Sequence, residues 1–491
     1  MKSNSFLLIA VTSLFLFTAC NPESEYNDKY LNSYSSLYDE SRLGTSEEQY
    51  EDYGENPFIA ASEEPVSTFS IDADGGSYAN MRRFMYYGQV PPEASVRIEE
   101  YINYFTFDYK EPTNGENVSL ESELSTCPWN ENHYLMRIGM KGKTIPENEL
   151  PNSNYVFLID VSGSMNDPDK LGILKTGFIA LVDNLKDQDR IAIVTYAGEA
   201  GVLLPSTYGD ERQDIKDAIK QLGAGGSTAG AAGITTAYEI AEENFIPGGN
   251  NRVILGSDGD FNVGPSSTEE LIEMIEEKRE TGIYLTVLGV GGGNLNDQMM
   301  EQIANKGNGN YEYIDNAKQI EKVFTNELGK LYTVAKDAKI QITFNTEMVD
   351  EYRLIGYENR VLENEEFEDD STDAGEIGSS QTITALYELV LHDASGTEEY
   401  AQFDFRYKKP DGILSRLLTH TINSTPVAID QASENMQFAA SITCFGLLMK
   451  QSEYKGSASR QMVLDLAGDA ISFDPYDYRE EFIDLVSDWK E

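Results

Sequence analysis

The chain has 491 residues, a formal net charge of -47 at pH 7, and hydrophobic residues at 40% of its positions. This length suffices for two or three domains that each bury a core of their own. The acidic excess argues against nucleic acid, or an anionic membrane surface, as a binding partner.

The first 20 residues have the pattern of a secretory signal. Lys2 precedes the apolar stretch Phe6 to Phe17, which is too short to span a bilayer, and small residues then precede Cys20. We therefore expect a lipoprotein signal peptide at residues 1 to 20 and lipid modification of Cys20. An ordinary signal peptide with a chance cysteine is the alternative, because Phe17 stands where lipoprotein signals usually carry leucine.

A lipidated Cys20 would place the protein in the bacterial cell envelope, anchored to a membrane by its lipid. The outer membrane is the expected location, with the periplasmic or surface face left open. Residues 21 to 63 are rich in Glu, Asp, Ser and Tyr and show neither helical nor strand periodicity. Such a segment buries too little apolar surface to fold alone, so it is predicted to be an acidic disordered tether.

Residues 64 to 150 are predicted to form an N-terminal flanking domain. Strand-like alternation covers 66 to 72 and 118 to 140, and a helical pattern runs between them from Tyr78 to Tyr104.

Residues 151 to 336 alternate strands and helices, which predicts parallel βαβ units in one doubly wound α/β domain. The strands are near-continuous apolar runs, typical of strands covered on both faces. They are expected at 154–160, 190–196, 251–257 and 282–290. Helices are expected at 168–186, 211–221, 229–245, 268–281, 295–305 and 316–334.

Residues 337 to 491 are predicted to form a C-terminal flanking domain in which strands precede helices. Strand-like patterns cover 340–344, 382–391 and 400–408. Helical patterns cover about 433–450, 457–468 and 478–490. Cys127 and Cys444 fall one in each flank, and they either pair across domains or remain buried thiols.

Candidate metal ligands follow the apolar strands of the central region. Asp160-Val161-Ser162-Gly163-Ser164 closes the first strand and puts one carboxylate and two hydroxyls on a tight loop. Thr228 offers a third hydroxyl, and Asp258 follows the strand at 251–257. The carboxyl ends of strands in an open α/β sheet meet at one edge, where ligands bind. A solvated turn with an Asx cap is the plainer interpretation of the first motif.

These five residues (Asp160, Ser162, Ser164, Thr228 and Asp258) are expected to surround one cation. Oxygen ligands without imidazole or thiolate favour Mg²⁺, or Mn²⁺ in its place, over zinc. The chain has three histidines, and none lies near the motif.

The D-x-S-x-S motif, the threonine and the second aspartate resemble the metal-ion-dependent adhesion site of von Willebrand factor A domains. Phe69 to Asn80 and Val96 to Phe105 resemble the N-terminal domain of a family of bacterial envelope lipoproteins that carry such a domain. Phe405-Arg406-Tyr407 and Phe438 to Trp489 are similar to that family's uncharacterised C-terminal domain. The resemblance implies a doubly wound, mostly parallel sheet inserted in a flanking antiparallel β-domain with additional helices.

The resemblance also implies which ligands touch the cation. Ser162, Ser164 and Thr228 would bind it directly, and Asp160 and Asp258 would act partly through water. A coordination position then remains for an Asp or Glu of a protein partner whose identity is unknown. Protein binding, and not an enzymatic reaction, is therefore expected.

Two alternatives stay open. The domain could be a structural scaffold subunit of an envelope complex, with the metal serving stability only. Asp72-Ala73-Asp74 is also similar to the D-x-D of haloacid-dehalogenase-type phosphatases, which are magnesium-dependent and use the first aspartate as nucleophile. A turn with Ser77 as N-cap of the next helix is the favoured interpretation of that segment.

Overall fold

The computed structural model describes residues 48–72, 74–197, 199–225, 230–259, 268–392 and 399–489. The predicted signal segment with Cys20, the larger part of the predicted tether, and Thr228 lie outside the described residues. Among the described residues, no helix is both long and apolar enough to cross a membrane.

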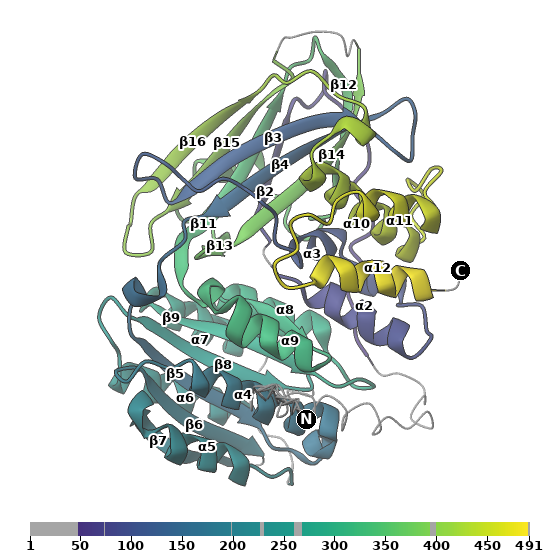
Figure 1. The fold of residues 1–491 in the computed structure, drawn as a ribbon. Helices are drawn as coiled ribbons and strands as arrows, with labels where there is room; N and C mark the ends of the chain where they lie inside the picture. The colour runs from purple at the N-terminus through teal and green to yellow at the C-terminus, as the bar shows by residue number, and fades with distance from the viewer. Residues whose placement is uncertain are drawn as a thin grey trace, which may run out of the picture. The chain divides into compact units, whose positions relative to one another are not determined.

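The central region is a six-stranded sheet with helices on both faces (Figure 1). Its strand order is β10-β9-β8-β5-β6-β7, and all neighbours are parallel except β7, which is antiparallel to β6. The strands are β5 (Ser153–Asp160), β6 (Arg190–Ala197), β7 (Glu199–Tyr208), β8 (Asn250–Ser257), β9 (Ile283–Val290) and β10 (Tyr311–Ile314). The four strands expected from the sequence are therefore present, and the two at the edges of the sheet are additional.

Each face of this sheet has its own apolar core. Phe157 and Phe178 stack on one face with ring centroids 4.2 Å apart, whereas Val156 and Leu158 point into the core on the other face. Alternate residues of one strand thus serve two cores, which explains why the strands read as continuous apolar runs. The covering helices are α4 (Ile173–Asp183), α5 (Arg212–Gln221), α6 (Gly230–Glu243), α7 (Thr268–Glu280), α8 (Asp297–Lys306) and α9 (Ala317–Glu321).

The helix expected at 316–334 is broken into three pieces. After α9, a π-helical turn spans Lys322–Asn326 and a 3-10 turn spans Leu328–Leu331. Glu327 lies between the two turns and is buried, with its carboxylate 2.5 Å from Lys322 Nζ and also paired with Lys330. Satisfying this buried carboxylate from both sides interrupts the regular helix.

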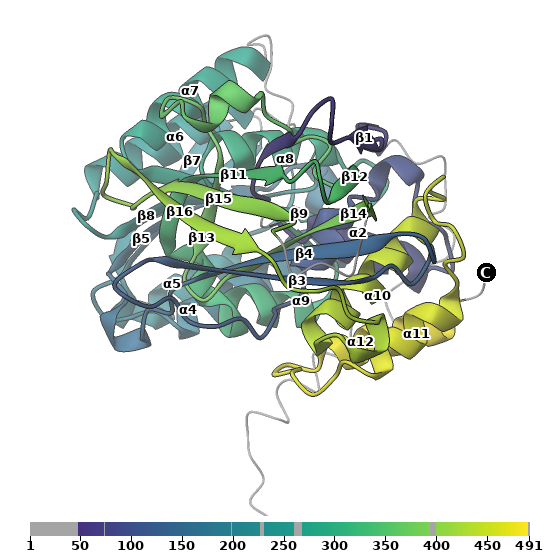
Figure 2. The ribbon, with the colours of Figure 1, turned by 90° about the horizontal axis from the view of Figure 1, so that it is seen from above.

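The two flanks fold together into a sandwich of two antiparallel sheets (Figure 2). One sheet has the order β1-β12-β14-β4-β3, and the other has the order β13-β11-β15-β16 with β2 also paired to β11. The N-terminal flank supplies β1 (Ile59–Ala60), β2 (Val66–Ser70), β3 (Val118–Thr126) and β4 (Tyr134–Gly142). The C-terminal flank supplies β11 (Thr333–Phe344), β12 (Val349–Ile355), β13 (Gly375–Gly378), β14 (Thr382–Leu391), β15 (Ala401–Lys408) and β16 (Ser415–Ile422).

Strands of both flanks occur in each sheet, since β4 pairs with β14 and β2 pairs with β11. Side chains such as Ile138 of β4 and Ile340 of β11 share one buried core. The α/β domain is therefore inserted in a flanking antiparallel β-domain, as the resemblance implies.

Helices from both flanks form a further layer beside the sandwich. They are α2 (Gly76–Tyr86), α3 (Ile98–Asn103), α10 (Glu434–Met449), α11 (Arg460–Gly468) and α12 (Tyr478–Asp488). The single helical pattern expected from Tyr78 to Tyr104 is two helices, because Pro91 and Pro92 interrupt it. Cys127 and Cys444 are separate buried thiols.

Ser77 is not the N-cap of α2, contrary to the sequence-based prediction. The N-cap is Gly75, and Ser77 lies inside the first turn, where its hydroxyl donates to the Ser95 carbonyl at 2.6 Å. The Glu100 carboxylate instead accepts from the Ser77 backbone N–H at 2.7 Å. A side chain from α3 thus satisfies the end of α2, which local spacing does not indicate.

Residues 48 to 63, within the predicted disordered tether, make specific contacts. Glu48 pairs with Arg83 at 2.8 Å, the Gln49 N–H donates to the Leu295 carbonyl at 2.9 Å, and β1 pairs with β12. The prediction is wrong for these residues, because an extended segment can be held by side-chain pairs without showing periodicity of its own.

Candidate metal centre at the strand ends

Asp160 ends the central strand β5 and is fully buried. Its Oδ1 accepts a hydrogen bond from the Ser162 N–H at 2.8 Å, and its Oδ2 accepts one from the Ser257 hydroxyl at 3.2 Å. Burial raises the pKa of Asp160, and the nearby charge of Asp258 adds to that effect, against these hydrogen bonds. The carboxylate is therefore fixed in place by the chain itself.

Ser162 and Ser164 present their hydroxyls together. A 3-10 turn spans Gly163–Asn166, and its buried Met165 anchors the turn in the apolar core. The two Oγ atoms lie 2.9 Å apart. The D-x-S-x-S loop thus holds one carboxylate and two hydroxyls on a short, packed turn.

Asp258 directly follows β8 and is fully buried. Burial would raise its pKa, but the Lys170 ammonium and hydrogen bonds from Lys170, Asn294 and Ser164 hold it below the usual value. Gly259 follows with a φ of +86°, and a Cβ there would meet the Asn296 backbone nitrogen at 2.4 Å. Only glycine fits this turn without strain.

Lys170 is a member of the site that the sequence analysis missed. It lies on the π-helical turn Pro168–Gly172, and its Nζ is 2.8 Å from Asp258 Oδ2 and 2.9 Å from Asn294 Oδ1. Its stem packs against Gly291, and the residue is only 5% exposed. In the sequence it has the spacing of an ordinary lysine in the first turn of a helix, so no local signal distinguishes it.

Thr228 lies outside the described residues. The described part of its loop ends at Gly225, whose N–H donates to the Val161 carbonyl at 2.7 Å. The loop is therefore anchored on the D-x-S-x-S turn three residues before Thr228.

The described donors fit a hard divalent cation. Two carboxylates and two hydroxyls meet at one edge of the sheet, and the hydroxyl oxygens are adjacent. His133, His392 and His420 belong to the flanking strands and their loops, so no imidazole joins the set. An all-oxygen set is suited to Mg²⁺ or Mn²⁺, and not to zinc.

The phosphatase alternative places a nucleophile at Asp72, which lies elsewhere. Asp72 is 2% exposed, its Oδ1 accepts from the Asp74 N–H at 3.0 Å, and its Oδ2 accepts from Arg360 at 2.9 Å. Asp74 accepts from the Tyr311 N–H. Both aspartates are engaged in a buried ionic network, and the Arg360 guanidinium occupies the Asp72 oxygen Oδ2.

Three sequence families match the chain. The family described as von Willebrand factor type A domain matches residues 154–326, and the one described as von Willebrand factor matches residues 44–137. The family described as uncharacterized protein YfbK, C-terminal, matches residues 329–491.

Similar proteins span a wide range of identity. The uncharacterized protein YfbK of Escherichia coli (strain K12) is 41% identical over 464 residues, which cover 89% of this chain and 80% of that protein. Inter-alpha-trypsin inhibitor heavy chain H3 of Homo sapiens is 27% identical over 164 residues, covering 32% of this chain and 18% of that protein. The solved structure of von Willebrand factor type A from Catenulispora acidiphila is 15% identical and covers 78% of this chain and 91% of its own, with a TM-score of 0.44.

Proposed function

Because the chain belongs to the YfbK family of proteins with a von Willebrand factor type A domain, we propose that it binds a protein partner through a metal ion. The ion is Mg²⁺, or Mn²⁺ in its place, held by Asp160, Ser162, Ser164, Thr228 and Asp258. The partner completes the coordination with the carboxylate of an Asp or Glu. The observation that supports this proposal is the convergence of four of these side chains, those of Asp160, Ser162, Ser164 and Asp258, at the carboxyl edge of the sheet.

The charges of the site favour an anionic partner group. Asp160 and Asp258 carry two negative charges, and Lys170 opposes them with one positive charge. A bound divalent cation supplies a Lewis-acidic coordination position and brings the net charge of the site to one positive charge. Because the surrounding aspartates are buried, that charge is weakly screened and attracts a carboxylate.

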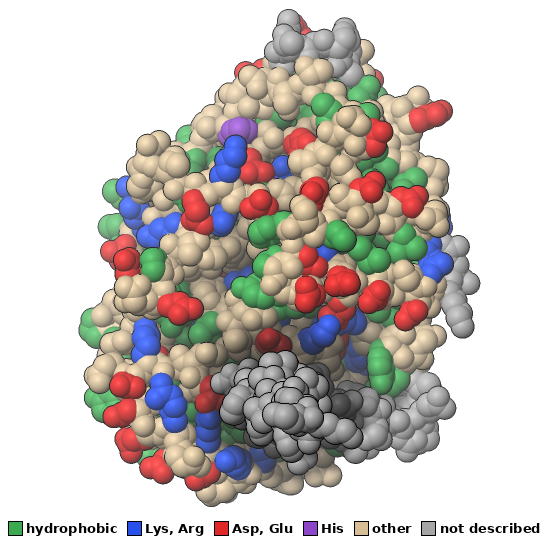
Figure 3. Space-filling model, in the orientation of Figure 1, with side chains coloured by type: hydrophobic (Ala, Val, Ile, Leu, Met, Phe, Trp, Pro, Cys, Tyr) green, Lys and Arg blue, Asp and Glu red, His purple; other side chains and the backbone are tan. Residues whose placement is uncertain are grey.

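Binding suits this site better than catalysis. Within the described residues, no histidine lies beside Ser162 or Ser164, the neighbouring carboxylates Asp160 and Asp258 belong to the proposed ligand set, and the two hydroxyls face each other. The surface around the inserted domain carries acidic side chains interspersed with basic ones (Figure 3). With the net charge of -47, this agrees with a protein partner and not with nucleic acid.

We also propose that lipid on Cys20 anchors the protein to the bacterial cell envelope, at the outer membrane. The support is the signal-like pattern of residues 1 to 20. Labelling cells with a fatty-acid analogue should mark the wild type and not Cys20→Ser, and Cys20→Ser should leave the membrane fraction. An unlabelled wild type would show an ordinary signal peptide instead.

The scaffold alternative has one observation in its favour, since buried ion pairs join the α/β domain to the flanks. Arg82 lies 2.6 Å from Asp315, for example. A scaffold would gain stability from the metal without gaining a metal-dependent partner. A magnesium-dependent phosphatase would instead hydrolyse a generic phosphoester such as p-nitrophenyl phosphate, and we expect no turnover.

Calorimetry of Mg²⁺ binding to residues 21–491, which leave out the proposed lipid-modified Cys20, tests the metal site. Wild type should bind one ion there, and Asp160→Ala and Asp258→Ala should each abolish that binding. Asp210→Ala is a matched control, because Asp210 is exposed and lies in the same domain away from the site. Unchanged binding in both site variants would overturn the assignment.

A further inference from the structure

A second group of carboxylates is buried where the α/β domain meets the flanks. It comprises residues from the link before α2, from α3 and from α8, and Arg360 of the loop after β12 contacts it. We call this group the acidic seam. Its carboxylates are Asp72, Asp74, Glu99, Glu100, Asp297 and Glu301, and its guanidinium groups are Arg97 and Arg360. None of the six carboxylate residues is more than 3% exposed.

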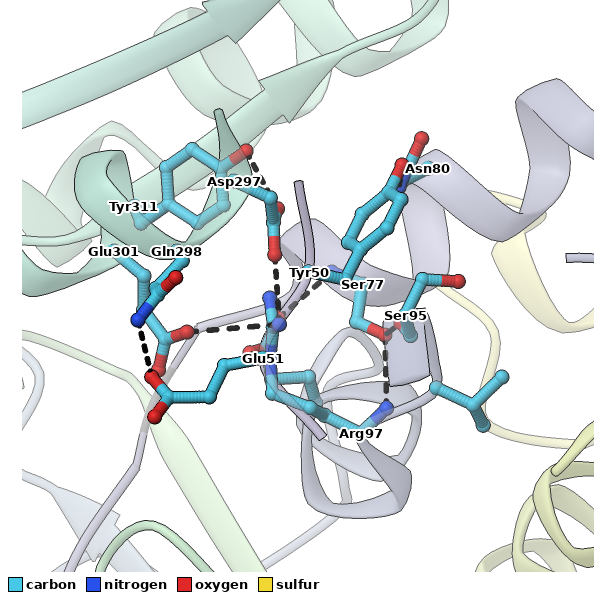
Figure 4. Close-up of polar contacts among 12 residues, drawn as sticks. Tyr50, Glu51, Ser77, Asn80, Ser95, Arg97, Asp297, Gln298, Glu301 and Tyr311 are labelled. Atoms are coloured by element: carbon cyan, nitrogen blue, oxygen red, sulfur yellow. Dashed lines mark hydrogen bonds and ion pairs between the residues drawn. The ribbon is translucent and has the colours of Figure 1, made fainter. Parts of the chain in front are cut away.

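Two arginines hold the seam together without balancing its charge. Arg97 Nη1 lies 2.7 Å from Asp297 and 3.5 Å from Glu301, and Figure 4 shows its side chain pointing between them. Arg97 Nε also donates to Glu100, while Arg360 lies 2.9 Å from Asp72. Six carboxylates thus face two guanidinium groups in a buried space. Such an excess must be neutralised by protons or by a cation.

Three of these carboxylates have the spacing of a metal-binding set. Asp72, Glu100 and Glu301 each place one oxygen so that all three oxygens lie within 4.8 Å of one another. Oxygen ligands lie ~2.4 Å from Ca²⁺, so two ligands of one ion are at most ~4.8 Å apart. The three oxygens can therefore contact a single ion.

Glu99 supplies an independent indication of a cation site. It is 0% exposed, and among the described residues no residue other than Glu99 itself donates a hydrogen bond to its carboxylate oxygens. Burial raises its pKa well above the usual range, and the charges of Glu358, Asp72 and Glu100 raise it further. A buried carboxylate that faces other carboxylates and has no donor is costly unless a cation lies nearby.

A cleft gives an ion access to the seam. It has a volume of about 470 Å³, and Asp72 and Glu301 form part of its wall. Asn359 also lines it, donating its Nδ2 to Glu301 at 2.7 Å while its buried Oδ1 has no donor in the described part of the chain. That amide oxygen offers a neutral acceptor next to the carboxylates.

We propose that the acidic seam is a second cation site, in which Asp72, Glu100 and Glu301 bind Ca²⁺ beside Glu99 and Asn359. Ca²⁺ fits better than Mg²⁺, because it accepts many carboxylate and amide oxygens in irregular geometry, whereas Mg²⁺ keeps its waters and demands an octahedron. Asp72 and Glu100 belong to the N-terminal flank and Glu301 belongs to the α/β domain. The ion therefore ties the two parts together, independently of the strand-end site.

The test uses the mature protein with Asp160→Ala and Asp258→Ala combined, which removes the strand-end site. Calorimetry and thermal unfolding are followed with Ca²⁺ alone. We expect one Ca²⁺ per chain and a rise in the unfolding temperature. Glu301→Gln in this background should weaken Ca²⁺ binding at least tenfold, whereas Glu273→Gln, an exposed change on α7, should leave it unchanged.

Absence of Ca²⁺ binding in the double variant would overturn the proposal, whatever the behaviour of Glu301→Gln. Glu99→Gln is a second test in case Glu301→Gln misfolds. It leaves the ion pairs of the seam intact and removes only the charge of a carboxylate that takes part in none of them. It should lower Ca²⁺ affinity and raise stability in EDTA. Ca²⁺ affinity unchanged from the Asp160→Ala, Asp258→Ala background in both Glu99→Gln and Glu301→Gln would mean that the ion lies elsewhere.

Discussion

The strand-end site and the acidic seam both combine buried carboxylates with basic side chains, but they differ in the ratio of the two. At the strand ends, one ammonium pairs with one of two aspartates, and hydroxyls from a short loop complete the set. In the seam, six carboxylates share two guanidinium groups contributed by distant parts of the chain. The first arrangement leaves a small, defined deficit of positive charge at one edge of one domain. The second leaves a larger deficit where three segments meet.

The positively charged side chain in each region therefore has a different role. Lys170 contacts one carboxylate and one amide oxygen, and a bound metal ion would compete with it for Asp258. Arg97 contacts three carboxylates at once, and removing it would leave the mutual repulsion of these buried carboxylates uncompensated. Replacing each cation by an isosteric apolar residue should separate a modulating role from a structural one.

The largest effect is expected for Arg97→Met. Removing one partner of a buried ionic network leaves uncompensated charge and costs about 3–5 kcal/mol of unfolding free energy. Urea denaturation at neutral pH measures it, with Arg416→Met as control, because Arg416 is 44% exposed on β16. A loss below about 1 kcal/mol, in the range of a surface pair, would show that the seam does not depend on this arginine.

A balanced buried group, Glu327 between Lys322 and Lys330, provides the contrast. Glu312 and Tyr478 also face it, and the two ammonium groups overcome burial to lower the pKa of Glu327 to about 2. Because its folded-state pKa lies below the unfolded value of 4.5, its stabilisation is present above pH 4.5 and disappears as the pH falls toward 2. Glu327→Gln should cost about 3 kcal/mol at pH 7.

Denaturation of wild type and Glu327→Gln at pH 7 and pH 3 checks this prediction. The difference between the two proteins should shrink at the lower pH, because wild-type Glu327 is then approaching its own protonation. An equal difference at both pH values would assign the loss to packing and not to charge.

A smaller effect is expected for Lys170→Met at the strand-end site. Removing one positive charge beside the ion relieves repulsion, so Mg²⁺ should bind about tenfold more tightly in calorimetry. Lys278→Met makes the same charge change on α7 and should not alter binding. Weaker binding in Lys170→Met would show that the lysine chiefly positions Asp258.

The smallest effect is expected for Thr228→Val, which keeps the shape of the side chain and deletes one hydroxyl ligand. With two serine hydroxyls and two carboxylates left, Mg²⁺ should bind about threefold more weakly but still saturate. Complete loss of Mg²⁺ binding in a folded Thr228→Val protein would mean that the threonine, and not the D-x-S-x-S loop, dominates the site.

The two regions also differ in how far sequence predicts them. Asp160, Ser162 and Ser164 are adjacent in the chain and follow a strand whose apolar run is unmistakable, so their convergence with Asp258 follows from the topology of parallel sheets. Lys170 was missed because its spacing is that of any lysine at a helix start. Its role depends on Asn294 and Gly291, which follow β9 and are more than 100 residues away in the sequence.

The acidic seam could not be predicted from local pattern at all. Asp72 was interpreted as part of a turn, and Glu100 and Glu301 lie on helices where acidic residues are usually exposed. Their burial arises only when the two flanks close into one sandwich and α8 packs beside them. The edge strands β7 and β10 were missed for a related reason, because a short or half-exposed edge strand lacks a long apolar run.

Partner capture tests the central claim most directly. Immobilised mature wild type and Asp160→Ala are incubated with bacterial envelope extract in Mg²⁺ or in EDTA, and retained proteins are quantified by mass spectrometry. Metal-dependent binding predicts a protein that is retained by wild type in Mg²⁺ and lost both in EDTA and with Asp160→Ala. Retention of the same proteins under all three conditions would contradict the account and leave a scaffold whose metal serves stability alone.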